Sequence, residues 1–110
     1  MIQASLRIVA PPEKRDDILR TFRSLLGPTR VASGCLQCHV CVDMEDENAL
    51  IYVEEWQTTE DLERRLQSDQ YRRILAMIEA STEPPELRFN TISETTGLEY
   101  LAAVRGVQNC

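Results

Sequence analysis

The sequence predicts an α+β fold in the element order β-α-β-β-α-β, followed by one further helix. Three observations lead to this prediction. Apolar residues recur at every second position near the start and the end of the chain, as in strands. They recur at helical spacing in two stretches between these ends. In the middle, two runs rich in Val, Ile, Tyr and Cys flank an acidic linker at residues 43–48, which is typical of a β-hairpin.

The first two elements are a strand and a helix. Over residues 1–10 apolar and polar side chains alternate, and the apolar face is made of Ile2, Ala4, Leu6 and Ile8. Pro12 suits the first position of a helix, and the acidic residues that follow it favourably meet the positive end of the helix dipole. Apolar residues then recur at helical spacing as far as Leu26, and Gly27-Pro28 is expected to stop or kink the helix.

The hairpin strands are predicted at residues 36–42 and 50–56. Because side chains alternate along a strand, the second strand has two distinct faces. One face carries Leu50, Tyr52, Glu54 and Trp56, and the other carries Ile51, Val53 and Glu55. Neither face is purely polar, so both are expected to be at least partly covered.

A second helical region follows the hairpin. Thr58 or Thr59 can cap its start, and Ser68 followed by an aspartate resembles a fresh cap, so the helix is predicted to bend or break there. A Glu-Pro-Pro sequence ends this region. A last strand is predicted at residues 87–92, and a short helix is predicted within residues 98–105.

This order is the split βαβ arrangement of ferredoxin-like folds, with a four-stranded antiparallel sheet. The predicted division is a ferredoxin-like domain over residues 1–94 and a C-terminal helical extension over residues 95–110. Helices cover only one face of such a sheet. The simplest cover for the other face is the same sheet of a second copy, so we expect a homodimer formed through the sheet faces.

Composition and charge exclude several classes of protein. The chain has 12 Lys and Arg against 18 Asp and Glu, a formal net charge of -6, so it has no basic surplus with which to bind nucleic acid. No apolar run approaches the roughly 20 residues that span a bilayer, and the N-terminus lacks the pattern of a secretion signal. We therefore expect a cytoplasmic protein with no membrane partner, whose four cysteines are mostly reduced thiols.

Three of the cysteines form a C-x-x-C-x-x-C pattern around the only histidine. Cys35, Cys38 and His39 match the string of a covalent haem site, and Cys41 adds a third thiol that could join a zinc or iron-sulfur site. In a regular strand, however, Cys35, His39 and Cys41 share one face and Cys38 lies on the other. The preferred interpretation is that these cysteines are small buried hydrophobic residues, and the protein is expected to be colourless and metal-poor.

Three parts of the chain carry a family resemblance. They are the Gly-Cys-Leu at Gly34 with the acidic turn after it, the run at residues 50–56, and the helical stretch at residues 59–71. Together they resemble the antibiotic biosynthesis monooxygenase family of dimeric α+β barrels. The match covers about residues 1–93 and is strongest over residues 34–78. The resemblance implies a homodimer, a pocket between sheet and helices, and cofactor-independent oxidation of electron-rich aromatic substrates such as quinols or anthrones.

The chain also departs from relatives within that family. Members often carry a histidine in the stretch that corresponds to residues 62–69, where this chain has none. The haem-degrading branch uses an asparagine on the first strand and a tryptophan and a histidine on the second helix. The matching positions here are Leu6, Arg65 and Leu75, so the resemblance does not extend to haem degradation.

The predicted site lies between the hairpin and the second helical region. Tyr52, Trp56 and Tyr71 are predicted to line an apolar cavity and bind an aromatic substrate, with packing in the core or an interface as the alternative. His39 or Glu54 is the candidate catalytic base: histidine is the usual general base near neutral pH, and Glu54 lies between the two aromatic residues of its strand. A solvated helix face that pairs with nearby acids is predicted for Arg64, Arg65, Arg72 and Arg73.

Three functions remain open at this point. The first is a small oxygenase or isomerase that acts on an aromatic or carbonyl metabolite without a metal. Within this class the resemblance favours a cofactor-independent monooxygenase for a small aromatic or quinol-like metabolite. The second is a dimeric ligand-binding or sensor domain of the same fold that carries out no reaction. The third is a haem-handling protein, which visible absorbance would reveal. An aromatic pocket serves the first two equally, because fold alone does not decide function.

Overall fold

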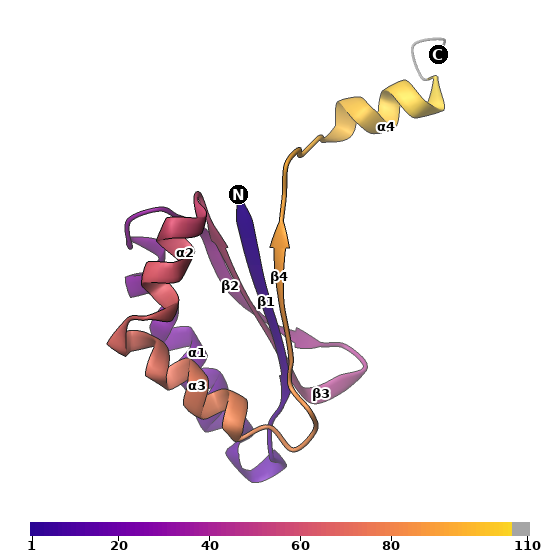
Figure 1. Cartoon of the computed structure of the whole chain (residues 1–110). Coiled ribbons are helices and arrows are strands. Elements are labelled where there is room, and N and C mark those ends of the chain that lie inside the picture. The colour runs from indigo at the N-terminus through magenta and orange to yellow at the C-terminus, as the bar shows by residue number, and fades with distance from the viewer. Residues whose placement is uncertain (107–110) are drawn as a thin grey trace.

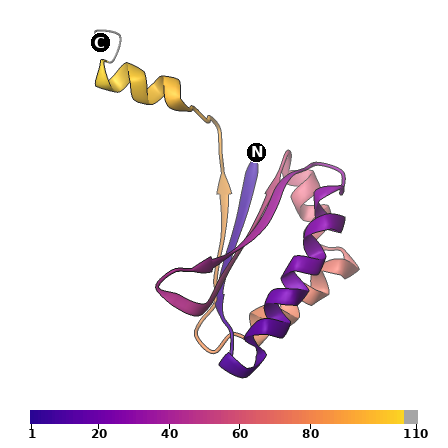
Figure 2. The same cartoon turned by 180° about the vertical axis from the view of Figure 1, so that it is seen from behind.

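In the computed structural model, which describes residues 1–106, four antiparallel strands form one sheet in the order β2-β3-β1-β4. Three helices, α1, α2 and α3, lie together on one face of this sheet (Figures 1 and 2). The strands are β1 (Ile2–Val9), β2 (Cys35–Asp43), β3 (Asp46–Trp56) and β4 (Glu86–Thr91). The helices are α1 (Arg15–Arg30), α2 (Thr59–Leu66), α3 (Arg72–Glu79) and α4 (Leu98–Arg105), with single 3₁₀ turns at Pro12–Lys14 and Asp69–Tyr71. The predicted ferredoxin-like α+β fold is confirmed.

β3 lies between β2 and β1, so it carries the centre of the sheet. Its pairing with β1 runs without a shift from Ile2 opposite Trp56 to Val9 opposite Ala49. The predicted alternation is confirmed, because Leu50, Tyr52, Glu54 and Trp56 are all buried on the side that the helices cover. One strand of the sheet therefore directs four side chains, at every second position, towards the helices.

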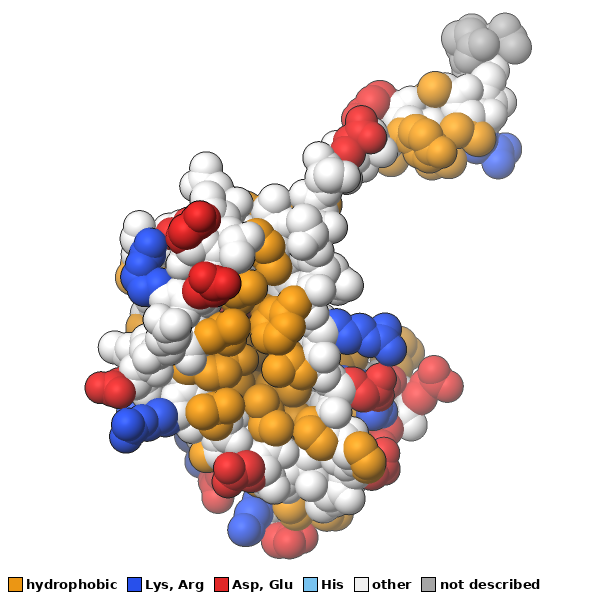
Figure 3. All heavy atoms as spheres, in the orientation of Figure 1, with side chains coloured by type: hydrophobic (Ala, Val, Ile, Leu, Met, Phe, Trp, Pro, Cys, Tyr) orange, Lys and Arg blue, Asp and Glu red, His pale blue; other side chains and the backbone are white. Residues whose placement is uncertain are grey.

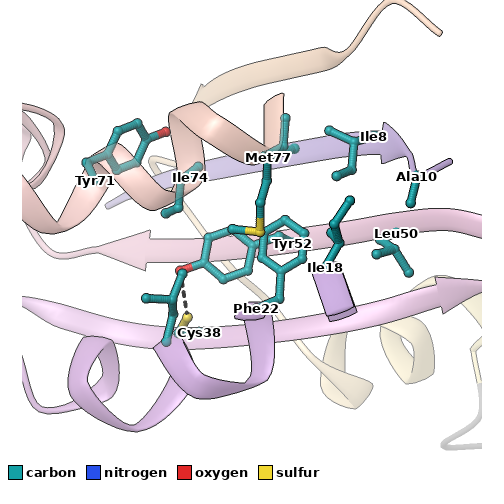
Figure 4. Packing of buried hydrophobic residues seen from close by; sticks show 12 residues of the cluster. Ile8, Ala10, Ile18, Phe22, Cys38, Leu50, Tyr52, Tyr71, Ile74 and Met77 are labelled. Atoms are coloured by element: carbon teal, nitrogen blue, oxygen red, sulfur yellow. Dashed lines mark hydrogen bonds between the residues drawn. The ribbon is translucent and has the colours of Figure 1, made fainter. Parts of the chain in front are cut away.

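The main core fills the space between the sheet and helices α1 and α3 (Figure 4). Phe22 of α1 stacks on the ring of Tyr52, with 4.9 Å between the ring centroids and 25° between the planes. Ile74 and Met77 reach the same cluster from α3. A smaller cluster beside it consists of Ile2, Ala4, Trp56 and Leu62. The two clusters meet at β3, the strand that carries the predicted site.

Two predicted boundaries are wrong. Helix α1 does not stop at Gly27-Pro28 but continues to Arg30, because the next turn still packs: Thr29 is buried against the rest of the domain. Proline costs a helix one backbone hydrogen bond, and here burial of that turn offsets the loss. The hairpin linker is also shorter than predicted. Asp43 pairs with Asp46, and its carboxylate accepts a hydrogen bond from the Glu45 amide, which closes a tight turn.

The helical break after α2 is confirmed. Thr58 is the N-cap of α2, and its hydroxyl accepts the backbone N–H of Asp61 at 3.1 Å. After Leu66 the chain makes a single 3₁₀ turn before α3 begins. The hydroxyl of Ser68 does not cap that turn but donates to the carbonyl of Arg65 at 2.7 Å. This bond ties the break to the end of α2.

A β-bulge changes the expected arrangement of the cysteines. Cys35 lies opposite Trp56, whereas Gln37 lies opposite Glu55, so Leu36 is an extra residue in β2. The prediction that Cys35 and Cys38 point to opposite faces is therefore wrong. Both pack against the core on the helix side, whereas His39 pairs with Val53 of the other face. Residues 1–106 contain no cluster of three or more His, Cys, Asp or Glu side chains suited to a metal ion.

The C-terminal part extends away from the domain. β4 pairs only with β1, and all its side chains are exposed. Helix α4 is present where predicted and ends at Gly106 in the left-handed conformation. It stands clear of the sheet and of the other helices (Figures 1 and 2). None of the helices in the described part of the chain is long and apolar enough to cross a membrane.

Candidate functional site

Glu54 is the centre of a buried polar network. It faces the helices from the middle strand and is only 2% exposed. Its carboxylate accepts hydrogen bonds from the Tyr52 hydroxyl at 2.5 Å and from the Trp56 indole N–H at 2.9 Å. Arg65 of α2 donates to it through Nη2 at 2.9 Å and through Nε at 3.2 Å. The buried negative charge is therefore both hydrogen-bonded and paired with a cation.

Arg65 does not lie on a solvated helix face, so that prediction is wrong for this arginine. Its side chain is 8% exposed, and its Nη2 also donates to the Thr29 hydroxyl of α1 at 3.1 Å. Its guanidinium lies 5.7 Å from the centroid of the Tyr71 ring. Arg65 follows the buried Leu62 by three positions, so both occupy the inner stripe of α2. One guanidinium thus joins α1, α2 and the sheet.

The other arginines of this region behave as predicted at the surface. Arg64 pairs with Asp61 at 3.0 Å, and Arg72 pairs with Asp69 at 3.7 Å. Exposed pairs of this kind contribute little to stability. Arg65 is therefore distinguished from its neighbours by burial.

The network continues from Tyr52 to Cys38 of the neighbouring strand. The Cys38 thiol donates to the Tyr52 hydroxyl at 3.3 Å (Figure 4). Burial raises the pKa of Cys38 to about 11. Burial and the negative charge of Glu54 also raise the pKa of the Tyr52 hydroxyl above its usual range, and the same two causes raise the pKa of Tyr71 to about 12. All three groups therefore keep their protons near pH 7, and those of Cys38 and Tyr52 form the hydrogen bonds to Tyr52 and Glu54.

A cavity of about 300 Å³ opens beside this network, between the C-terminal end of α1 and α2. This volume is at the lower end of the range for small-molecule sites. Its lining is mainly apolar, with polar groups at a few positions. The lining includes Leu25, Thr29, Trp56, Asp61, Arg65 and Ser68. Trp56 and Arg65 thus contact both the Glu54 carboxylate and the cavity.

The wall of the cavity depends on a glycine. Gly34 has a φ of 86°, in the left-handed region. A Cβ added at this position would lie only 2.2 Å from the carboxylate of Asp61. The same carboxylate accepts the Thr58 hydroxyl at 2.8 Å. A side chain at position 34 would therefore displace Asp61 from the cavity wall.

The structure brings most of the predicted site residues together. Trp56 lines the cavity, Tyr52 and Glu54 lie behind it in the buried network, and Tyr71 packs against Arg65. His39 lies on the other face of the sheet from Glu54. The catalytic roles of His39 and Glu54 stay predictions.

Thr29 and Arg65 are site residues that the sequence-based prediction missed. Thr29 follows Pro28, where the sequence predicts that the helix stops or kinks, so the pattern predicts no inward position for it. For Arg65 a signal was present, because it continues the stripe of Leu62 and because a buried Glu54 requires a cation close by.

A four-stranded antiparallel sheet with helices on one face, and a cavity at its helix-covered side, defines the protein as ferredoxin-like. The sequence profile of one family, antibiotic biosynthesis monooxygenase, matches residues 1–77. The chain belongs to this family. No curated protein matches it in sequence.

Solved structures agree with this assignment at the level of the fold. A structure described as an antibiotic biosynthesis monooxygenase is 20% identical, with a TM-score of 0.74, over 86% of this chain and 100% of its own. A Deinococcus radiodurans protein is 17% identical, with a TM-score of 0.79, over 88% of this chain and 97% of its own. A Pseudomonas aeruginosa protein is 24% identical, with a TM-score of 0.72, over 84% of this chain and 94% of its own.

Proposed function

We propose that the protein is a monooxygenase that binds a small, planar, quinol-like aromatic compound in the cavity beside Trp56 and oxidises it with O₂ without a bound cofactor. The observation that carries the proposal is that an aromatic ring and a buried guanidinium line the same cavity, which has a mainly apolar wall. Membership of the antibiotic biosynthesis monooxygenase family supports the reaction type.

In this proposal the indole of Trp56 contacts the face of the substrate ring. Arg65 holds the substrate oxygen. Its Nε and Nη2 are directed at Glu54 and Thr29, which leaves the two N–H groups of Nη1 as donors for a ligand. A cationic donor at this position favours a substrate phenolate or enolate over the neutral form. Glu54 acts as a positioning residue, because its carboxylate holds both the indole N–H and the guanidinium.

The reaction follows from the stabilised anion. The reacting carbon is a CH₂, as in anthrone and in the keto tautomer of a hydroquinone. It releases one proton to solvent water and becomes an electron-rich carbanion, which transfers electrons to O₂ and forms a carbon–oxygen bond. The resulting peroxide takes up a proton and then loses water: one oxygen atom becomes the carbonyl oxygen of the product, the other leaves as water, and the carbon has lost both of its hydrogens. The apolar wall contributes by confining the ring and by excluding bulk water.

The second part of the proposal is a homodimer formed through the open faces of the two sheets. In the described chain no helix covers this face, which carries Val53 and Ile51 at its centre. The face also carries polar groups that are already paired, such as Gln3 with Glu55 at 3.1 Å and Arg7 with Asp43 at 3.7 Å. A second sheet would cover the apolar centre, and sedimentation at micromolar concentration tests this expectation: a monomer would contradict it.

The binding step is tested with the fluorescence of Trp56, the only tryptophan. Hydroquinones and anthrone, added in increasing concentration, are expected to quench its emission saturably. Arg65→Lys keeps the charge but not the planar fork, and it is expected to weaken binding about tenfold. Arg72→Lys, at an exposed arginine that does not line the cavity, is the matched control and should leave binding unchanged. Absence of saturable quenching with all these compounds would refute the aromatic site.

The turnover step is tested by oxygen consumption with the same compounds. One observation favours the alternative of a binding or sensor domain without chemistry: the Glu54 carboxylate is already engaged by three side chains, so no unpaired carboxylate of the buried network faces the cavity. Saturable quenching without enzyme-dependent oxygen uptake would support that alternative. Uptake that saturates with substrate and falls in the Arg65→Lys variant would support the monooxygenase.

A further inference from the structure

We propose that α4 is an intermolecular arm, which packs against the helix-side surface of β4 on a second copy of this chain. This proposal concerns an interaction surface and does not depend on the reaction assigned to the cavity. Within residues 1–106, two exposed apolar surfaces support this proposal, together with the direction in which the chain leaves the sheet.

The first surface is α4 itself. Four of its side chains are large, apolar or aromatic, and more than half exposed: Leu98 at 82%, Tyr100 at 61%, Leu101 at 53% and Val104 at 67%. Leu98, Leu101 and Val104 recur every three residues and so share one side of the helix. Figure 3 shows apolar side chains gathered along one side of this helix. A helix of eight residues is not stable alone in water, so α4 requires a packing partner.

The second surface is the β4 patch, which we define as Leu87 and Phe89. By register these residues lie opposite Leu6 and Ala4, so they belong to the helix-covered side of the sheet. Yet Leu87 is 39% and Phe89 is 46% exposed, whereas their partners on β1 are buried. The helical layer therefore ends before the edge strand. Figure 3 shows apolar side chains exposed together on the face where β4 and the helices meet.

The path of the chain directs α4 away from its own β4 patch. Beyond the last residue of β4, the Ile92 amide donates to the Met1 carbonyl at 2.8 Å, and the terminal amino group of Met1 donates back to the Ile92 carbonyl at 3.1 Å. These bonds hold the chain in the direction of the strand as far as residue 92. Consequently α4 projects past the end of the sheet (Figures 1 and 2).

The dimensions of the two surfaces agree. A helix of eight residues is about 12 Å long, and a strand of six residues extends about 20 Å, so α4 fits along β4. Each copy offers one arm and one β4 patch, so two copies related by a two-fold axis satisfy both at once. A second copy is therefore the occupant that the molecule supplies with matching surfaces.

The test is hydrogen exchange of the amides in residues 98–105, measured by mass spectrometry on the whole chain. A docked α4 should exchange at least about tenfold more slowly than an unstructured peptide. An arm variant, Leu98→Asp/Leu101→Asp, and a patch variant, Phe89→Asp, should each lose this protection. Met44→Asp, at the fully exposed hairpin turn, is the matched control and should keep it. Protection that survives Phe89→Asp would overturn the β4 patch as the docking surface.

Mixing the two variants separates a second copy from folding back within one chain. The patch variant, labelled with ¹⁵N, keeps an intact arm, and the unlabelled arm variant keeps an intact β4 patch. When the two are unfolded and refolded together in equal amounts, about half of the labelled arms should find an intact patch on the other chain and regain protection. Unchanged exchange after mixing would overturn the proposal, as would fast exchange of residues 98–105 in the unmodified protein.

Discussion

Replacing Arg65 by methionine tests whether the buried network holds the site together. Methionine keeps most of the side-chain volume but removes the charge and all donors. Glu54, at 2% exposure, then keeps its hydrogen bonds from Tyr52 and Trp56 and loses the cation with which it pairs. Thr29 also loses its bond from the guanidinium. The variant therefore leaves a buried carboxylate without a counter-charge.

The expected loss is large. Removing one member of a buried ion pair costs about 3–5 kcal/mol of unfolding free energy, which is a substantial part of the about 5–15 kcal/mol available to a domain. Replacing Glu54 by glutamine in the same molecule removes the unpaired charge while keeping an oxygen that accepts hydrogen bonds. The double variant Arg65→Met/Glu54→Gln should therefore be more stable than Arg65→Met by at least about 1 kcal/mol.

Urea denaturation followed by the fluorescence of Trp56 measures these differences, because the indole lies in the network. Arg64→Met is the matched control. Arg64 pairs with Asp61 at the surface, and its side chain is 61% exposed, so its loss should cost less than about 1 kcal/mol. The reasoning is refuted if Arg65→Met unfolds at the same urea concentration as Arg64→Met, or if the double variant is no more stable than Arg65→Met alone.

Three further predictions concern single groups. The pKa of Cys38 is raised from 9.0 to about 11, so its contribution to stability is complete below pH 9 and is lost as the pH rises through 11. Urea titrations should show that the unfolding free energy declines by up to about 3 kcal/mol over this pH range, and the decline should be smaller in Cys38→Ala. Gly34→Ala should lower stability by at least about 2 kcal/mol in thermal unfolding, because the new Cβ meets the Asp61 carboxylate and φ is positive; an unchanged melting temperature would contradict this. Trp56→Phe should cost about 1–3 kcal/mol by circular dichroism, because Glu54 loses a buried donor, and a neutral result would mean that water replaces the indole.

Most of the fold could be predicted from the sequence because its elements have distinct periods. Apolar side chains alternate on β1 and β3 and form a stripe on α1. Each spacing is compatible with one type of element, a strand or a helix, and it indicates which side chains of that element are buried. The boundaries were less predictable. Pro28 carries a strong local signal for a helix end, but packing of Thr29 outweighs it. Local signals describe the cost of continuing a helix, whereas the compensation comes from distant residues.

The site was predictable in part for a related reason. Strand alternation placed Tyr52, Glu54 and Trp56 on one face, and this is confirmed. The partner of Glu54 was not predicted, since Arg65 is next to an arginine that does lie at the surface. The number of residues between two positions indicates which side chains share a face of one element. It does not indicate which face of a helix meets a given strand.

The bulge at Leu36 means that the number of residues at the start of β2 determines which of its side chains face the core. With this extra residue, Cys35 lies opposite Trp56 and packs on the same side as Cys38, whose thiol meets Tyr52 in the core, while the imidazole of His39 lies on the opposite face. Removing one residue there would convert the bulge into regular pairing or reverse the orientation of the side chains before it. Relatives that differ in length at this point would then carry different chemical groups behind the same cavity, although their strands superimpose.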